Sequence, residues 1–543
     1  MKILLLLLLS IFFLTSEEAI SQFSQQWAKR YNASGNGNDE AYKTAIDNNG
    51  NVYVTGRSFL SASNFDYATI KYSANGDELW VSRYNGTGGI DEANAIAVDN
   101  AGNVYVTGKS QGGASNSDFV TIKYNSSGDQ LWLRSYNGPG NGIDNAVAIA
   151  VDVNENVYVT GTSWSGVNYD IASIKYNALG VVQFVIRYNG PGNGDDFPVS
   201  LHAENNEFFY ITGASTGSGS DYDFVTIMYL PNGTANWIRR YNGPDNSADY
   251  GRSVSVDNAG NVLVTGESVS ASIGYDFATI KYSVTGDSLW VKRFNGSANG
   301  DDISVSVKTD NQNNVYVTGS SLGTGTNQDY VTLKYNSSGD QQWLQRYNGI
   351  SNGRDVPSAM VIGNDNSVYI TGVSLGSGTG NDFATVKYNE SGIEQWSRTY
   401  NGNGNGIDAA TSIAVNSQEF VVVTGLSYGG SGTNYDYATI KYSQISGIQS
   451  LSNEIPSEYM LYQNYPNPFN PVTNIKFDVV KSGNVKITVS DISGKLVSEL
   501  INSRVNPGTY LVDFNASQLA SGIYFYTLSV QDNVITKKMT VLK

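Results

Sequence analysis

Aspartates are the side chains whose spacing could support chemistry, because they recur in register with a repeated phrase. The phrase is Val-Thr-Gly or Ile-Thr-Gly, and it occurs eight times. One series of aspartates precedes the phrase glycine by 17 residues, and a second series follows it by 9 to 11 residues. The first series is Asp39, Asp91, Asp144, Asp196, Asp249, Asp302, Asp355 and Asp408, and the second is Asp66, Asp118, Asp170, Asp223, Asp276, Asp329, Asp382 and Asp436.

Both series fall near stretches rich in Gly, Asn and Ser, which we interpret as loops on one face of a repeat structure. A loop aspartate can accept hydrogen bonds from nearby backbone N–H groups and so fix a turn. Repetition in every unit favours this structural role, because a single binding site needs no eightfold copies. The functional alternative is a cation or sugar site. Oxygen-rich loops suit Ca²⁺, although the chain has no Asp-x-Asp-x-Asp-Gly spacing.

The sequence contains few candidate residues for other kinds of catalysis. The chain has no cysteine, which excludes disulfides, thiolate zinc sites and thiol nucleophiles. His202 is the only histidine, and no Gly-x-Ser-x-Gly elbow accompanies it. We therefore expect no cofactor and predict that His202 is packed rather than catalytic. The fourth repeat departs most from the others, with Phe184, His202 and Phe209, so it is the first place to look for a special site.

The repeated phrase indicates the architecture. Its glycines are 52 or 53 residues apart, a period typical of propellers and solenoids. The second repeat contains four predicted strands, at residues 95–98, 103–108, 119–124 and 131–136, separated by turns rich in Asn and Gly. Four strands per repeat are typical of a propeller blade. The fourth strand carries Trp80, Trp132, Trp237, Trp290, Trp343 or Trp396, which we expect to pack between blades.

The ends of the array predict how the propeller closes. Residues 27–31 resemble a lone fourth strand, and the array stops at a third strand, residues 437–442. Pairing these two segments would complete the last blade and leave no blade with a missing strand. The prediction is an all-β chain with an eight-bladed β-propeller closed by the N-terminal strand. The alternative of seven blades would leave one repeat unplaced.

The N-terminus predicts export. Lys2 is followed by an apolar run at residues 3–14 and by small residues before a predicted cleavage site after Ser21. We therefore divide the chain into a signal peptide (1–21), the propeller (22–442), a linker (443–458) and a C-terminal domain (459–543), with no transmembrane segment after cleavage. The net charge of -16 argues against nucleic acid as a partner.

The repeats resemble a bacterial β-propeller repeat family. The resemblance covers residues 27–442 and rests on the pattern D-x-G-N-V-Y-V-T-G followed by D-F-x-T-I-K-Y-N. It implies an extracellular propeller and says little about a ligand. The family is often described as seven-bladed, whereas the repeat count here favours eight.

The C-terminal domain resembles the type A sorting domain of the type IX secretion system. The matching stretches are residues 465–471 (Tyr-Pro-Asn-Pro-Phe-Asn-Pro), 485–497, 519–524 and 537–543. Strands predicted at residues 473–479, 485–491, 510–514, 523–530 and 534–541 indicate a small β-sandwich. The resemblance implies that the type IX machinery is a partner and that the protein is secreted or held at the surface of a Gram-negative bacterium. It also implies a sorting signal that includes Gly522, Tyr524, Lys537 and Lys538.

The near-identity of the repeats, without a unique polar cluster, predicts a non-enzymatic binding or scaffold protein. Its ligand would be an extracellular glycan or protein. The alternative is a secreted enzyme that acts on polysaccharide at the propeller mouth, because paired carboxylates can hydrolyse glycosides and aspartates are abundant.

Overall fold

The computed structural model describes residues 21–61, 64–112, 116–270, 274–452, 455–516, 519–531 and 533–542. Every regular element among them is a β-strand, which confirms the all-β prediction. No helix in this described part is long and apolar enough to cross a membrane. Residues Gln26–Tyr442 form one compact unit, and the chain from Ser443 onward belongs to a second. The predicted signal peptide lies outside the described residues, apart from Ser21.

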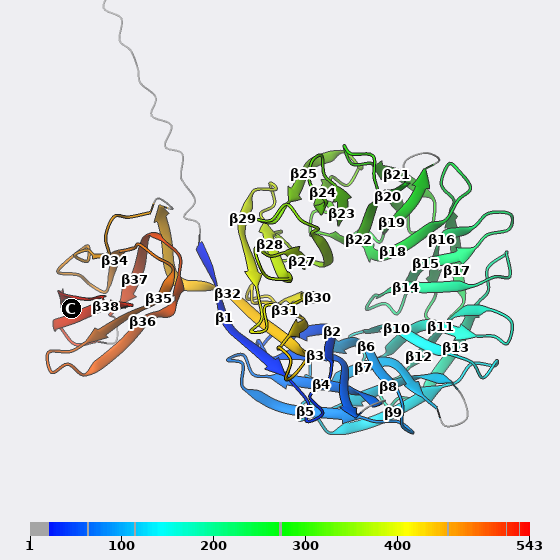
Figure 1. Ribbon diagram of the computed structural model, residues 1–543, viewed down its shortest axis with the longest axis horizontal. Helices are drawn as coiled ribbons and strands as arrows, with labels where there is room; N and C mark the ends of the chain where they lie inside the picture. The colour runs from blue at the N-terminus through cyan, green and yellow to red at the C-terminus, as the bar shows by residue number, and fades with distance from the viewer. Residues whose placement is uncertain are drawn as a thin grey trace, which may run out of the picture. The chain divides into compact units, whose positions relative to one another are not determined.

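The first unit consists of antiparallel sheets arranged around a central opening (Figure 1). Seven sheets have four strands, and in each the strands follow one another in chain order. An eighth group, β30–β31–β32, has three strands in chain order, and β1 pairs with β32. Sheets one to four are β2 (Asp39–Ile46), β3 (Val52–Ser61), β4 (Asn64–Tyr72), β5 (Glu78–Tyr84); β6 (Asp91–Val98), β7 (Val104–Gln111), β8 (Ser117–Tyr124), β9 (Gln130–Tyr136); β10 (Asp144–Val151), β11 (Val157–Trp164), β12 (Tyr169–Tyr176), β13 (Val182–Tyr188); and β14 (Asp196–Ala203), β15 (Phe209–Thr216), β16 (Tyr222–Tyr229), β17 (Ala235–Tyr241).

The remaining sheets repeat this order. They are β18 (Asp249–Val256), β19 (Val262–Ser270), β20 (Gly274–Tyr282), β21 (Ser288–Phe294); β22 (Asp302–Thr309), β23 (Val315–Leu322), β24 (Gln328–Tyr335), β25 (Gln341–Tyr347); β26 (Val356–Ile362), β27 (Val368–Leu375), β28 (Asn381–Tyr388), β29 (Glu394–Tyr400); and β30 (Asp408–Val415), β31 (Val421–Tyr428), β32 (Tyr435–Ser452) with β1 (Ser21–Tyr31).

Local chemistry explains the hairpins inside each sheet. In the second sheet, Asp99 Oδ1 accepts hydrogen bonds from the N–H groups of Ala101 and Asn103, at 2.9 Å each. Gly102 has φ 79, a conformation that costs glycine little because it has no Cβ. The aspartate and the glycine together turn β6 back into β7, as the sequence pattern predicts.

Neighbouring sheets share their apolar side chains. Tyr53 and Tyr67 of the first sheet belong to the same buried cluster as Val104 and Ile122 of the second. The Tyr67 hydroxyl also donates to the Val120 carbonyl across the boundary, at 3.3 Å. A sheet with two apolar faces buries them only between two neighbours, so each sheet depends on the next for stability.

The first and last sheets are joined by contacts of the same kind. The Tyr437 hydroxyl donates to the Ala68 carbonyl at 3.2 Å, and the Thr44 N–H donates to Ser412 Oγ at 3.3 Å. Trp27 of β1 packs in one cluster with residues of both sheets. The spacing of the repeats therefore brings the two ends of the array side by side (Figure 1).

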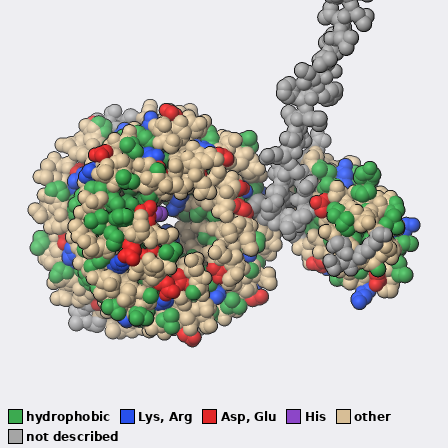
Figure 2. Space-filling view, turned by 180° about the vertical axis from the view of Figure 1, so that it is seen from behind, with side chains coloured by type: hydrophobic (Ala, Val, Ile, Leu, Met, Phe, Trp, Pro, Cys, Tyr) green, Lys and Arg blue, Asp and Glu red, His purple; other side chains and the backbone are tan. Residues whose placement is uncertain are grey.

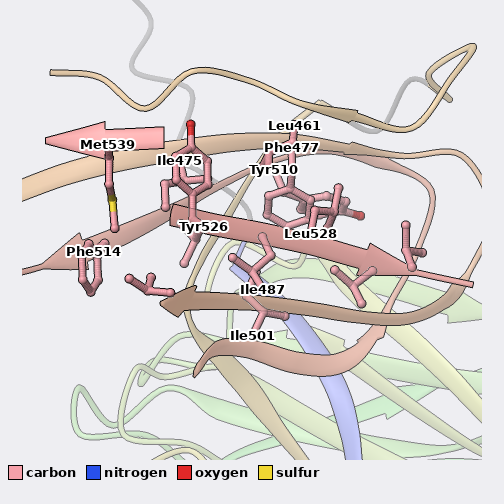
Figure 3. Packing of buried hydrophobic residues seen from close by; sticks show 14 of the residues in the cluster. Leu461, Ile475, Phe477, Ile487, Ile501, Tyr510, Phe514, Tyr526, Leu528 and Met539 are labelled. Atoms are coloured by element: carbon pink, nitrogen blue, oxygen red, sulfur yellow. The ribbon is translucent and has the colours of Figure 1, made fainter. Parts of the chain in front are cut away.

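The second unit has two sheets around one core. One contains β33 (Met460–Leu461), β34 (Val472–Val479) and β37 (Gly508–Asn515), and the other has the order β36–β35–β38–β39. Ile475, Phe477 and Tyr510 from the first sheet meet Ile487 and Leu528 from the second (Figure 3). This is a small sandwich. Its second sheet comprises β35 (Gly483–Ser490), β36 (Leu496–Val505), β38 (Gly522–Val530) and β39 (Asn533–Val541).

Three segments of this unit differ from the sequence-based prediction, and one of them is the two-residue strand β33. The sequence pattern does not predict β36, because two register shifts in its pairing with β35 disturb the alternation that marks a half-buried strand. The predicted linker is a strand over residues 443–452, where β32 continues and Ile448 pairs with Val512 of β37. That pairing depends on a partner more than 60 residues away, which local composition does not reveal.

Replacing Arg30 should destabilise the first unit, because this side chain ties β1 to the last sheet. Arg30 donates to Asp436 Oδ2 at 2.8 Å and to the Ser427 carbonyl at 2.8 Å. Arg30→Ala would leave the buried Asp436 carboxylate without its cation, and we expect a loss of about 3 kcal/mol in the free energy of unfolding. Chemical denaturation measures this loss. Gln25→Ala, at an exposed position of the same strand, is the control, and an equal effect of both changes would contradict the prediction.

Candidate functional site

Fifteen of the sixteen aspartates predicted in loops lie on strands, which corrects the prediction, whereas Asp355 directly precedes β26. Asp91, Asp144, Asp196 and Asp249 are the first residues of β6, β10, β14 and β18, and each is at most 1% exposed. Asp118, Asp170, Asp223 and Asp276 lie in the third strands β8, β12, β16 and β20. The first strands begin earlier than predicted, because a register shift after their third residue, as between Ala93 and Ala95, breaks the apolar alternation.

The third sheet shows what these carboxylates contact. Asp144 Oδ2 accepts from the Gly138 N–H at 2.7 Å, and Asp144 Oδ1 accepts from the Trp164 N–H at 3.0 Å. Asp144 therefore fastens the loop that enters the sheet to the end of the second strand. Arg187 of the fourth strand donates to Ser163 Oγ at 2.6 Å and to Asp170 Oδ2 at 3.0 Å. Arg187 also donates to the Tyr136 hydroxyl of the preceding sheet at 3.0 Å.

The same interactions recur around the first unit. In every repeat the first-series aspartate accepts from a backbone N–H six or five residues earlier, in the loop that enters the sheet. In six of the sheets an arginine forms an ion pair with the second-series aspartate. These ion pairs are Arg83–Asp66, Arg187–Asp170, Arg240–Asp223, Arg293–Asp276, Arg346–Asp329 and Arg30–Asp436.

Two sheets depart from this pattern. In the second and seventh sheets the arginine position holds Ser135 and Thr399, which pair with Val120 and Ala384 in the same register as Arg83 with Ala68. Asp382 instead accepts from Thr379 Oγ1 at 3.0 Å. The arginines thus bridge strands within a sheet, and four of them also donate to a tyrosine hydroxyl of the preceding sheet.

Burial shifts the titration of the first series. Desolvation raises the pKa of Asp39, Asp91, Asp144, Asp196, Asp249, Asp302 and Asp355 above the ordinary value of 3.8, against the opposing effect of their hydrogen bonds. Among the described residues, no group of three or more acidic or histidine side chains converges on a position for a metal ion. The geometry suits these aspartates to holding loops.

A pocket lies between the fourth and fifth sheets, on the face that carries the hairpins of each sheet. Its volume is about 960 Å³, and its lining includes His202, Glu204, Phe208, Tyr210 and Met228. Burial and the ammonium group of Lys308 lower the pKa of His202 to about 4, so the imidazole is neutral at pH 7. Phe184, His202 and Phe209 mark the fourth repeat as unusual in the sequence. Met228 is a further departure, because it stands where the other repeats have lysine.

The predicted sorting residues lie on the last two strands of the second unit. Gly522 begins β38, Tyr524 pairs with Met539, and Lys537 and Lys538 lie on β39 opposite Tyr526 and Phe525. Lys538 is exposed, whereas Lys537 is half-buried.

The proline-rich motif fixes the end of the chain. The Phe469 N–H donates to the Thr540 carbonyl at 3.1 Å, and the Leu542 N–H donates to the Phe469 carbonyl at 2.9 Å. Asn467 Oδ1 accepts from the Thr540 N–H at 2.9 Å. Phe469 itself is buried in the core of the unit. The motif therefore holds β39 against the sandwich.

Comparison with protein families confirms both resemblances. Residues 463–542 match the family described as "Secretion system C-terminal sorting domain". Residues 79–113 and 236–274 match the family described as "Beta-propeller repeat". No curated protein matches the chain. The chain therefore carries β-propeller repeats followed by a secretion sorting domain, and the sorting domain indicates export to the cell surface or the medium.

Several solved structures show a distant likeness. One is PorZ, described as an essential bacterial surface component of the type IX secretion system of Porphyromonas gingivalis, with 13% identity over 92% of this chain and 68% of that chain and a TM-score of 0.39. Drosophila Plexin A in complex with Semaphorin 1b has 10% identity over 77% of this chain and 88% of that chain, with a TM-score of 0.34. An α-L-arabinofuranosidase from Fusarium graminearum has 13% identity over 56% and 92%, with a TM-score of 0.33. These values are too low to transfer a function.

Arg240→Ala should cost about 3 kcal/mol in the free energy of unfolding, because it leaves the buried Asp223 carboxylate without its cation. The neighbouring Arg239 is the matched control. Its guanidinium donates to the Gly286 and Thr285 carbonyls, and it has no hydrogen bond to a carboxylate among the residues that the structure describes. Arg239→Ala should cost about 1 kcal/mol or less. Urea denaturation of both variants measures the difference. A similar loss in the two variants would argue against the bridging role.

The raised pKa values of the first series should make the protein more stable at mildly acidic pH. The folded state favours the protonated carboxyl groups, so their contribution is present near the ordinary value of 3.8 and is lost as the pH rises through the raised pKa values. The thermal midpoint should therefore be higher near about pH 4.5 than near about pH 8. Asp302→Asn keeps an acceptor for the Gly296 N–H and removes one titrating group, so it should flatten this dependence. A midpoint that rises steadily toward pH 8 would contradict the assignment.

Proposed function

We propose that this protein is a non-enzymatic binding or scaffold protein of the cell surface of a Gram-negative bacterium, exported by the type IX secretion system. The propeller unit would carry the binding function, and the C-terminal unit would serve export. Its ligand would be an extracellular glycan or protein.

The observation that carries this proposal is the internal use of the repeated carboxylates. The first-series aspartates accept backbone hydrogen bonds in every repeat, and six second-series aspartates pair with arginine. Carboxylates used in this way are held in place by partners and are not free to act as general acids or bases. The neutral His202 lies in a pocket without a serine among its lining residues. These features favour binding over catalysis.

We also infer that the propeller has eight blades and that β1 completes the last one. Three observations support this inference: β1 pairs with β32, Arg30 repeats the arginine–aspartate bridge of the other sheets, and Tyr437 repeats the inter-sheet hydrogen bond of Tyr67. A strand supplied from the other end of the array would hold the ring together, since opening it would expose the faces of two sheets.

Removal of residues 459–543 should leave the protein in the periplasm, because the sorting domain directs passage across the outer membrane. Fractionation of cells that express the truncated and the full-length chain, followed by immunoblotting, measures the distribution. The propeller unit is compact by itself, so the truncated chain should remain folded. Normal delivery of the truncated chain to the surface would disprove the proposed route.

Purified propeller should bind a surface polysaccharide or a cell-wall fraction without changing it. Glycan arrays and pull-down with cell-wall fractions would identify the ligand, and reducing-sugar release would measure turnover. We expect retention on at least one glycan or cell-wall fraction and no release of reducing ends. Steady release of reducing ends, proportional to the protein concentration, would favour a polysaccharide-active enzyme instead.

A further inference from the structure

The pocket between the fourth and fifth sheets lies where the other sheets place a lysine. Lys71, Lys123 and Lys334 each pair across the strands with a second-strand tyrosine, in the register Tyr53–Lys71. In the fourth sheet the same register pairs Tyr210 with Met228. All seven other repeats have lysine at this position, so Met228 is the single departure. The lysines are Lys71, Lys123, Lys175, Lys281, Lys334, Lys387 and Lys441.

The lysine ammonium fills the space between two sheets. Lys71 Nζ lies 5.2 Å from the centre of the Tyr53 ring and donates to the Ser126 carbonyl of the next sheet at 2.9 Å. Lys334 likewise lies over Tyr316 at 5.1 Å and donates to the Glu390 carbonyl at 3.1 Å. In two sheets the ammonium also pairs with the carboxylate that caps the first hairpin, as in Lys281–Asp257 at 2.8 Å and Lys387–Asp365 at 3.1 Å.

The fourth sheet keeps the acceptors of this ammonium without the lysine. The Tyr210 ring occupies the place of Tyr53, and Glu204 replaces the hairpin carboxylate and accepts from the Tyr210 hydroxyl at 3.1 Å. The Val284 carbonyl, which corresponds to that of Ser126, accepts from Trp237 Nε1 at 3.1 Å. A carbonyl oxygen can accept two hydrogen bonds, as that of Ser126 does from Lys71 and Trp80. The site therefore has a ring face, a carboxylate and a carbonyl that could bind a cation, and no lysine or arginine is among the described residues that line it.

The walls of the site are more apolar than those of its counterparts. Phe208 stands where Asn51 lies in the first repeat, and Val284 stands where Ser126 lies. The corresponding pocket between the first two sheets has a volume of about 330 Å³ and contains Lys71, against about 960 Å³ here. The neutral His202 adds no positive charge to the lining of the pocket. Acidic side chains lie on the face around the central opening (Figure 2).

We propose that this pocket, lined by Glu204, Phe208, Tyr210, Met228 and Val284, binds a primary alkylammonium group on an apolar stem. The ammonium would take the place of the missing lysine Nζ, over the Tyr210 ring and beside Glu204, and the stem would pack on Met228 and Phe208. The ligand could be a free amine or the lysine side chain of a partner peptide. This inference rests on the proposed binding function and names a ligand class for it.

Binding of n-pentylamine to the full chain at neutral pH tests the proposal. Calorimetry or ligand-observed NMR should show saturable binding of n-pentylamine and much weaker binding of n-pentanol, which has the same stem without the charge. A short peptide with one central lysine distinguishes the two sources of the group. Tighter binding of the peptide than of the amine would assign the site to a partner lysine, and the reverse would assign it to a free amine. Equal affinity of pentanol and pentylamine would overturn the proposal.

Two variants test whether pentylamine binds in this pocket or elsewhere on the surface. Met228→Lys restores the repeat pattern, so it should fold, raise the thermal midpoint and weaken pentylamine binding by at least about tenfold. Glu204→Gln keeps an oxygen for the Tyr210 hydroxyl and removes the charge, and it should weaken pentylamine binding without changing pentanol binding. Val185→Lys is the charge-matched control, at a strand position 42% exposed outside the pocket, and it should leave the affinity unchanged.

The outcomes distinguish this inference from the function on which it rests. Undiminished pentylamine binding to the Met228→Lys variant would overturn the pocket assignment and leave a binding function elsewhere on the propeller intact. If the protein binds a glycan but not pentylamine, the pocket assignment would likewise be wrong and the proposed binding function would stand. Catalytic turnover by the wild-type protein would instead refute the non-enzymatic function, whatever the result with the amine.

Discussion

The structure of the first unit depends on one constraint: each sheet has two apolar faces and cannot bury both by itself. Tyr53 and Tyr67 of the first sheet are fully buried only because Val104 and Ile122 of the second cover them. Each sheet depends on the next in the same way. The hydrogen bond from the Tyr437 hydroxyl to the Ala68 carbonyl connects the last sheet with the first. Stability in such an array is shared between neighbouring sheets. The strand β1, which pairs with the last sheet, therefore contributes to the stability of the whole unit.

The charged side chains of the repeats hold loops and strands in the positions that this packing requires. The first-series aspartates fasten the loop that enters a sheet to the second strand of that sheet, and six second-series aspartates form ion pairs with arginine. Burial of so many carboxyl groups is costly, as the raised pKa of Asp144 and Asp196 indicates, and the hydrogen bonds offset that cost. A network of this kind explains why the same carboxylates recur in every repeat without an eightfold binding site.

Uniform repeats make single departures informative. Ser135 and Thr399 stand in place of an arginine, and the strands that carry them keep the same backbone pairing as in the other sheets. Met228 has a larger effect, since the lysine that it replaces fills the space between two sheets elsewhere. One side-chain change, together with Phe208 and Val284, therefore converts a small polar gap into a pocket with unused acceptors.

The sequence by itself determined the strand content, the repeat period, the two-part organisation and the sorting family, because these follow from local alternation, turn residues and specific motifs. It also identified the fourth repeat as the unusual one. Only the tertiary structure decided the partners of the aspartates, the strand nature of residues 443–452, the presence of β36 and the pocket beside Met228. These features depend on residues far apart in the chain, such as Arg30, which forms an ion pair with Asp436, or Met228, which lines one pocket with the hairpin of the next sheet. Periodicity along a sequence shows which side chains share a face, but the neighbour that covers that face is set by packing in three dimensions.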